Sequence, residues 1–172
     1  MFVVDSLLGN FDRHNGNWGF LFNKKEQTIK IAPVYDCGSC LFSQASDELM
    51  EYFLSTPEEM NKRTYEFPNS ALKLNDKKIN PYEYINSLKN NGLNLALLRI
   101  VPKINIEEIS KIVDDCLYIS DVRKTFYKTI INKRYEEILL APYNKLVANL
   151  NETKNKENEE NQENSDEEED EL

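Results

Sequence analysis

The sequence predicts an α+β domain that is mostly helical and spans residues 1–150, followed by an acidic tail at 151–172. Three observations favour this. Apolar residues alternate on either side of a polar turn between Trp18 and Ala32, which is typical of a β-hairpin. From Pro81 onward, apolar residues recur at helical spacing. The tail contains Asn, Glu, Asp and Lys with a single apolar residue at its end, so it cannot bury enough surface to offset chain entropy and is expected to be disordered.

The first elements frame two loops. Met1–Leu8 is apolar at helical spacing and Gly9 is a natural helix end, so the last turns of a helix are expected here. Two short strands are expected at Trp18–Phe22 and Thr28–Ala32. Pro33 has no backbone N–H for a sheet ladder and ends the second strand. The hairpin is therefore expected to return the chain to the loop that precedes it.

The rest of the domain is expected to be a helical bundle. A first short helix begins at Ser46 or Asp47, which can cap it, and the segment 55–80 is irregular. Pro81 suits a first helical position. The helix that begins at Pro81 is expected to end at Gly92. Pro142 is a candidate kink in the last helix. The expected later helices are 81–92, 93–101, 105–120 and 121–150.

Charge and cysteine content exclude several classes of function. The chain has 172 residues and a formal net charge of −9. The tail holds 11 of the 30 acidic residues and 2 of the 21 Lys and Arg, so the body carries 19 of each sign. No basic cluster indicates direct nucleic-acid binding, and no apolar run approaches membrane-spanning length. Three Cys without a signal peptide favour a reduced, cytoplasmic setting.

Three oxygen-bearing residues stand in the order used by phosphoryl-transfer sites. Asp12 and Asn17 lie five positions apart in the loop before the hairpin, and Asp36 follows the hairpin. Such a site needs a carboxylate that orients the attacking hydroxyl and oxygen ligands that hold Mg²⁺ against the phosphates. Asp12 is therefore the candidate catalytic residue, and Asn17 and Asp36 are the candidate Mg²⁺ and cofactor ligands.

These motifs carry a resemblance to a known family. The runs Asp-Arg-His-x-x-Asn-Trp-Gly-Phe at 12–20 and Ala-Pro-Val-Tyr-Asp-Cys-Gly-Ser at 32–39 resemble the C-terminal lobe of the HipA-like bacterial serine/threonine kinases. The resemblance implies an ATP-dependent, Mg²⁺-dependent kinase with a protein substrate. It covers residues 1 to about 45 by motif, and the helical remainder only by general character. The core also resembles the catalytic loop of phosphatidylinositol kinases, but the Pro-Val-Tyr-Asp lead-in favours HipA.

The resemblance also defines what this sequence lacks. HipA-like kinases carry an ATP-gripping N-terminal lobe before the catalytic loop, and no glycine-rich phosphate loop occurs here, with five Gly in the chain. The chain alone is therefore expected to be inactive as a kinase. The lobe could be a separate chain, or the partner could be an antitoxin-like protein. A remnant, or an interaction module that keeps the fold without catalysis, is the alternative from another class.

Neighbouring residues have less specific interpretations. His14, the single histidine, could contact phosphate as a cofactor-binding residue, but a buttress of the loop is favoured because Asp12 already fills the orienting position. Arg13 could pair with a phosphate or a carboxylate equally well. Cys37 and Cys40 have CxxC spacing, yet too few further ligands for zinc and no thioredoxin-like context. The alternating aromatics Trp18, Phe20 and Phe22 are expected to pack in the core.

Overall fold

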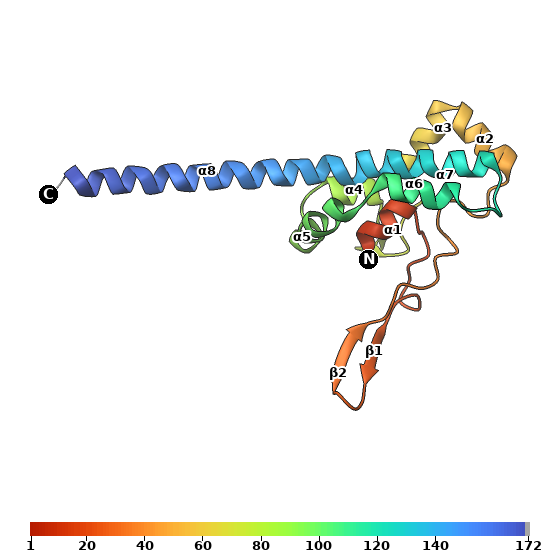
Figure 1. The fold of residues 1–172 in the computed structure, drawn as a ribbon, viewed down its shortest axis with the longest axis horizontal. Helices are drawn as coiled ribbons and strands as arrows, with labels where there is room; N and C mark the ends of the chain where they lie inside the picture. Colours follow the sequence, from red (N-terminus) through yellow and green to blue (C-terminus); the bar gives the residue numbers. More distant parts are fainter. Residues whose placement is uncertain (171–172) are drawn as a thin grey trace.

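A long helical rod is the axis of the structure, a computed structural model that describes the backbone of residues 1–170 and the side chains through residue 156. The helices α7 and α8 run on as this rod, the shorter helices gather around one end of it, and the hairpin β1–β2 projects away (Figure 1). The elements in chain order are α1 (Phe2–Leu8), β1 (Phe20–Asn23), β2 (Thr28–Ile31), α2 (Asp47–Ser55), α3 (Pro57–Asn61), the π-helix η1 (Lys62–Glu66), β3 (Lys73–Leu74), β4 (Lys77–Lys78), α4 (Pro81–Asn86), α5 (Asn91–Ile100), the 3₁₀ turn η2 (Val101–Lys103), α6 (Ile106–Asp114), α7 (Asp121–Arg134), the π-helix η3 (Tyr135–Leu140) and α8 (Ala141–Asp170).

Helix α7 joins two hydrophobic clusters. Phe126 and Ile130 pack with Met50, Phe53 and Met60 from α2 and α3. On its other side, α7 contributes to a larger cluster, which holds Val3, Leu7, Ile85, Leu97, Val101, Ile131, Ile138 and Leu139. Each such side chain stabilises the fold by about 1.5–3 kcal/mol relative to exposure. Because α1 belongs to the larger cluster, the loop that follows α1 begins from a fixed point.

Side-chain caps explain where the helices begin. Ser46, Asn80, Asn105 and Ser120 each accept a hydrogen bond from the backbone N–H three residues on. These bonds satisfy one of the free donors at each helix start, and they identify Ser46 as the cap of α2 where the sequence left Ser46 and Asp47 as candidates. Asn90 does the same for α5, whose second residue is Gly92. The prediction that Gly92 ends the preceding helix is therefore wrong.

The long C-terminal helix accommodates Pro142 without an interruption. Pro142 lacks an N–H, and its ring crowds the carbonyl four residues back. The turns directly before it, Tyr135–Leu140, are wound as a π-helix, and α7 and α8 still run on as one rod (Figure 1). The structure therefore shows a local change of winding at the position where the sequence predicted a kink.

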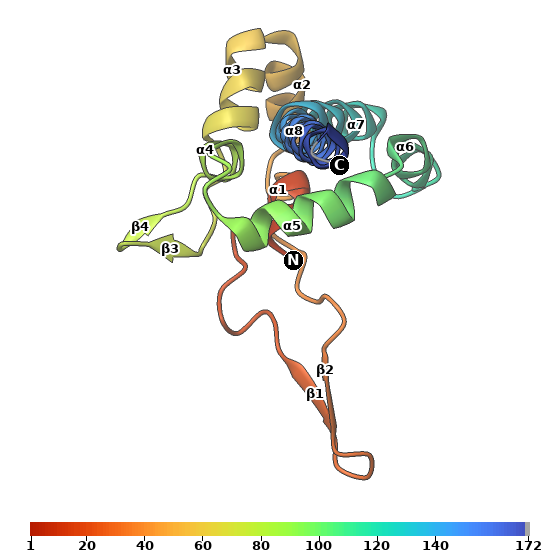
Figure 2. The same cartoon turned by 90° about the vertical axis from the view of Figure 1, so that its left-hand side faces the viewer.

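The hairpin β1–β2 is confirmed, but its packing is not as predicted. The register pairs Phe20 with Ile31 and Phe22 with Ile29, so these four residues share one face. Their exposed fractions are 61%, 67%, 53% and 67%, respectively. Trp18 stacks edge-on against Phe20 and is also exposed. The prediction that Trp18, Phe20 and Phe22 pack in the core is therefore wrong, because the hairpin extends beyond the helices that could cover them (Figure 2).

Helix α8 runs into the segment 151–172, which the sequence predicts to be disordered. Helix α8 continues to Asp170, while residues 171 and 172 lie outside the described residues. Glu and Lys are good helix formers, and extending an existing helix avoids the cost of nucleation. Within the described part of the chain, no helix has the length and apolar character needed to cross a membrane.

Candidate active site

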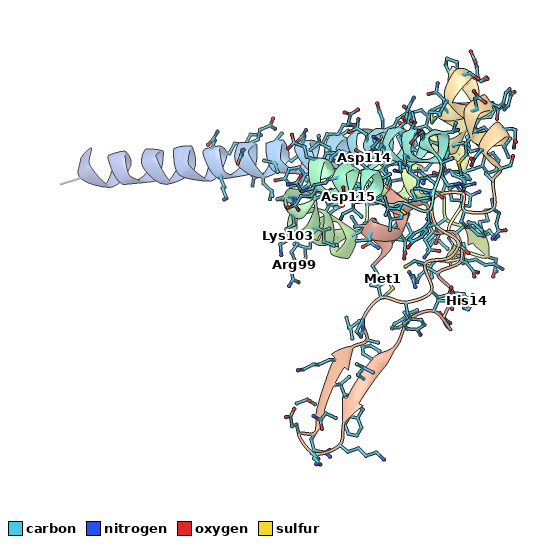
Figure 3. The ribbon with its side chains drawn as sticks, turned by 45° about the vertical axis from the view of Figure 1, so that its right-hand side comes forward. Met1, His14, Arg99, Lys103, Asp114 and Asp115 are labelled. Carbon is cyan, nitrogen blue, oxygen red and sulfur yellow. The ribbon has the colours of Figure 1, made fainter. Side chains whose placement is uncertain are left out.

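The candidate site lies at the root of the hairpin, where β1–β2 joins the helical body. The first loop, Asn10–Asn17, follows α1, and the second, Tyr35–Gly38, follows β2. Gly9 ends α1 in the left-handed conformation with φ 64°, which glycine adopts without strain. Figure 3 shows His14 at the outer side of the first loop, close to where the strands begin.

A buried ion pair anchors the first loop to α1. Arg13 Nε donates to both carboxylate oxygens of Asp5, at 3.3 and 3.1 Å, and Nη2 donates to Oδ1 at 3.1 Å. Asn10 Nδ2 donates to the same carboxylate at 3.1 Å. All three residues are buried. The hydrogen bond to Asp5 raises the pKa of Arg13 above its ordinary value, so the guanidinium stays charged inside the protein.

The same guanidinium joins the first loop to the second. Arg13 Nη1 donates to the carbonyl of Asn17 at 2.5 Å and to the carbonyl of Tyr35 at 2.7 Å. Nη2 also lies 3.8 Å from Cys37 Sγ. A second link comes from the Tyr35 hydroxyl, which donates to the carbonyl of Gly16 at 3.0 Å. These contacts confirm the prediction that the hairpin returns the second loop beside the first, and they assign Arg13 to a carboxylate and two carbonyls.

A hydrogen bond from the side-chain amide nitrogen fixes the orientation of Asn17. Nδ2 donates to the carbonyl of Asp12 at 2.8 Å, and Asn17 is buried. The amide oxygen accepts no hydrogen bond from the described residues, so it can serve as a ligand. The backbone N–H of Asp12 donates to Asn10 Oδ1 at 3.1 Å, which fixes the start of the loop. Asp12 is half-buried, so its carboxylate can reach a substrate.

Asp36 lies between two residues that contact Arg13. Its neighbours, Tyr35 and Cys37, both contact the Arg13 guanidinium. Asp36 itself is exposed, and its φ of 54° is in the left-handed region, which Asp tolerates better than most residues. An amide oxygen from Asn17 and a carboxylate from Asp36 suit Mg²⁺, which takes one or two protein oxygens and completes its shell with water and phosphate. That these two oxygens meet at one ion stays a prediction.

His14 supports the local turn of the first loop. Its Nδ1 accepts a hydrogen bond from the backbone N–H of Gly16 at 3.0 Å, and the ring is exposed. This contact agrees with a buttress of the loop. A role for His14 in cofactor binding stays a prediction.

An apolar groove of about 690 Å³ opens beside the first loop. Phe11, the neighbour of Asp12, forms part of its wall together with Leu49 from α2 and Phe67. Arg63 and Lys78 are the charged residues that line it. A ligand bound in this groove would lie beside the segment that carries Asp12, because Phe11 forms part of the wall.

A second buried arginine supports the groove and the start of the first loop. Arg134 Nη2 donates to the carbonyls of Arg63 and Phe67, at 2.8 and 3.2 Å. Burial lowers the pKa of Arg134 to about 9, which leaves it charged at neutral pH. A side chain at Gly9 would put its Cβ 2.1 Å from Arg134 Nη1. Glycine is therefore needed at position 9 for two reasons: a side chain there would clash with Arg134, and the backbone has a left-handed conformation.

Sequence reasoning missed Asp5, Asn10 and Arg134 as parts of the site. Asp5 had a detectable signal, because a carboxylate inside an otherwise apolar helix needs a buried cation as its partner. Arg13 was the nearest candidate. Arg134 had no such signal, because an arginine near the end of a polar helix is usually exposed.

No protein-family model matches the chain. The chain is 45% identical, over 148 residues, to "Serine/threonine-protein kinase CtkA" of Helicobacter pylori strain J99. This alignment covers 86% of the chain and 46% of the relative. A crystal structure of a Helicobacter pylori proinflammatory kinase CtkA matches 86% of this chain and 50% of that chain, with a TM-score of 0.82 and 44% identity. The chain is therefore homologous to a serine/threonine kinase and has the fold of that kinase along most of its length, while spanning about half the length of its relative.

Proposed function

We propose that this chain is the metal-binding and acceptor-binding lobe of a HipA-like serine/threonine kinase, which transfers the γ-phosphate of ATP to a protein hydroxyl. The observation that carries the proposal is the contact of Arg13 with both loops, because it brings the Asn17 and Asp36 segments together. Homology to a serine/threonine kinase supports the reaction class.

Each candidate residue has a distinct task in this proposal. Asp12 accepts a hydrogen bond from the acceptor hydroxyl and orients its oxygen toward the phosphorus. Asn17 and Asp36 hold the metal side of the site. Mg²⁺ bound there would neutralise charge on the phosphate oxygens. Arg13 and Asp5 position both loops before the substrate arrives, so little reorganisation is needed during transfer.

The nucleotide clamp is proposed to come from polypeptide outside this sequence, whether joined to it or supplied as a separate lobe. The sequence contains no glycine-rich phosphate loop, and its relative is about twice as long. The exposed face of β1–β2, formed by Phe20, Phe22, Ile29 and Ile31, is the proposed docking surface for that lobe. A two-stranded hairpin is marginally stable by itself, so a partner that covers this face would stabilise it. An antitoxin-like protein is the other occupant to be tested.

The apolar groove beside Phe11 is proposed to hold the protein substrate near its acceptor hydroxyl. An extended peptide advances about 3.3 Å per residue, so a residue close to the acceptor can reach the groove. Apolar walls and the cation Lys78 would favour an apolar residue next to an acidic one, whereas Arg63 already pairs with Glu59 at 3.2 Å.

A chimera tests the proposal. The homologous half of the Helicobacter pylori CtkA is replaced by this chain, and transfer of radioactive phosphate from ATP to serine-containing protein is measured. We expect activity in the chimera and none in this chain alone. Asp36→Asn should lower the rate at least about a hundredfold, because it replaces the anionic carboxylate at the metal site with a neutral amide. Asp76→Asn, in the exposed β3–β4 turn, is the matched control. An active Asp36→Asn chimera, or phosphorylation of phosphatidylinositol only, would contradict the assignment.

A further inference from the structure

Cys37 and Cys40 lie at the two ends of a tight turn directly after Asp36. The backbone N–H of Cys40 donates to the carbonyl of Cys37 at 3.1 Å. Residues i and i+3 of such a turn have Cα atoms less than about 7 Å apart, and disulfides span Cα separations of about 4.4–6.8 Å. The next turn is fixed as well, because Ser43 N–H donates to the carbonyl of Cys40 at 3.1 Å. The backbone therefore holds the two cysteines at a separation that a disulfide can bridge.

The two thiols have different environments. Cys37 is exposed and Cys40 is buried. Burial, and then the nearby Cys37, raise the pKa of the Cys40 thiol to about 11. Cys40 therefore stays protonated at neutral pH, and the exposed Cys37 meets a reagent from solvent first. This is the arrangement of an attacking cysteine with a resolving cysteine behind it.

Metal binding does not account for the pair. Among the described residues, no group of three or more His, Cys, Asp and Glu side chains gathers at one point. Among the described residues, Cys37 Sγ accepts one side-chain hydrogen bond, a long one from Arg13 Nη2 at 3.8 Å. The pair is therefore available for chemistry of its own.

We propose that Cys37 and Cys40 form a redox-active dithiol that a hydroperoxide converts to an intramolecular disulfide beside Asp36. The Cys37 sulfur attacks the peroxide and becomes a sulfenic acid, releasing one water when hydrogen peroxide is the oxidant. The Cys40 sulfur then displaces the hydroxyl of the sulfenic acid as a second water. Two thiols lose two electrons and two protons, and one peroxide is reduced to two waters. The bond would draw the Cys37 sulfur toward Cys40 and away from Arg13, the residue that joins the two loops of the site.

The experiment uses the full chain, hydrogen peroxide and mass spectrometry of tryptic fragments under non-reducing conditions. Both cysteines lie in the fragment 31–62, and Cys116 lies in the fragment 112–123. We expect fragment 31–62 to lose two hydrogens at least about tenfold faster than Cys116 is oxidised, because Cys37 is exposed and Cys116 is only half-exposed, and because the adjacent Cys40 completes the disulfide. Dithiothreitol should restore the original mass.

Variants establish the order of events. Cys40→Ser should leave a sulfenic acid on Cys37 that dimedone captures, and Cys116→Ser should not change the disulfide yield. If fragment 31–62 keeps its mass while Cys116 is oxidised, or if Cys37 proceeds to sulfinic acid with Cys40 present, the proposal is wrong. None of these measurements depends on kinase activity, so they test the dithiol separately from the proposed function.

Discussion

At the scale of single residues, Arg13 is the centre of the site. It pairs with the Asp5 carboxylate and donates to carbonyls of Asn17 and Tyr35. A planar guanidinium presents five N–H donors in a fixed fork, whereas a lysine presents three from a single nitrogen atom. In the proposed reaction, Arg13 positions the two loops and contacts neither phosphate nor metal.

Removing the partner of Arg13 should be costly. Asp5→Ala leaves a buried guanidinium without its carboxylate, and we expect the free energy of unfolding to fall by about 3–5 kcal/mol. The control is Asp114→Ala, which breaks the exposed pair with Lys128 and should cost less than about 1 kcal/mol. Urea denaturation measures both. Equal losses in the two variants would show that the buried pair has no special role in stability.

Cys40 should make stability depend on pH in the alkaline range. Its pKa is raised in the folded state to about 11, so the folded protein binds more protons than the unfolded chain between about pH 9 and 11. The stabilising effect of the protonated thiol is therefore complete below about pH 9 and is lost as pH rises through 11. In total the free energy of unfolding should fall by about 3 kcal/mol, because each unit of pKa difference between the folded and unfolded states corresponds to about 1.36 kcal/mol. Cys40→Ala should remove this loss in urea titrations, and Cys116→Ala should not.

At the scale of elements, the hairpin β1–β2 stands out because its apolar face is not buried. Its apolar face is exposed on four paired residues, whereas the two buried clusters are formed by residues of the helical body. Exposed apolar patches of this kind mark interaction surfaces. The element that links the two loops of the site is thus also the one whose apolar face no described part of the chain covers.

Polar substitutions on this face should separate docking from stability. Phe22→Ser with Ile29→Thr should change the free energy of unfolding of the isolated chain by less than about 1 kcal/mol, because little buried contact is lost. The same pair should abolish activity of the CtkA chimera if the nucleotide-binding lobe docks here. Lys30→Ser, on the opposite face, is the control. Full activity in the double variant would exclude this surface as the docking site.

Several elements could be predicted from sequence because their determinants are local. The helix starts at Ser46 and Asn105 depend on a side chain and a backbone N–H three residues away. The hairpin depends on alternation and on Pro33. Burial of the hairpin could not be predicted, because it depends on which other segments lie near it. The buried roles of Asp5 and Arg134 depend on contacts between residues far apart in the chain, as for Arg134 with Phe67.

At the scale of the whole molecule, the two loops, the hairpin and the groove meet at one side of the helical body. Helix α7 fixes this arrangement, because it packs against α2 through one cluster and joins the cluster of α1 through the other. The long helix α8 leaves the body in a different direction, roughly at right angles to the hairpin (Figure 1). The proposed chemistry therefore occupies the part of the molecule where the exposed hairpin would receive a second lobe.

The convergence of Asn17 and Asp36 on one ion is the central claim, and paramagnetic broadening by Mn²⁺ tests it most directly. Mn²⁺ takes the same oxygen ligands as Mg²⁺, and it broadens nearby amide signals in an NMR spectrum of the ¹⁵N-labelled chain. We predict that the Asn17 and Asp36 amides broaden at the same Mn²⁺ concentration, and that Asp36→Ala abolishes the broadening at Asn17. Broadening at Asn17 that persists in Asp36→Ala, or that never occurs, would contradict the account.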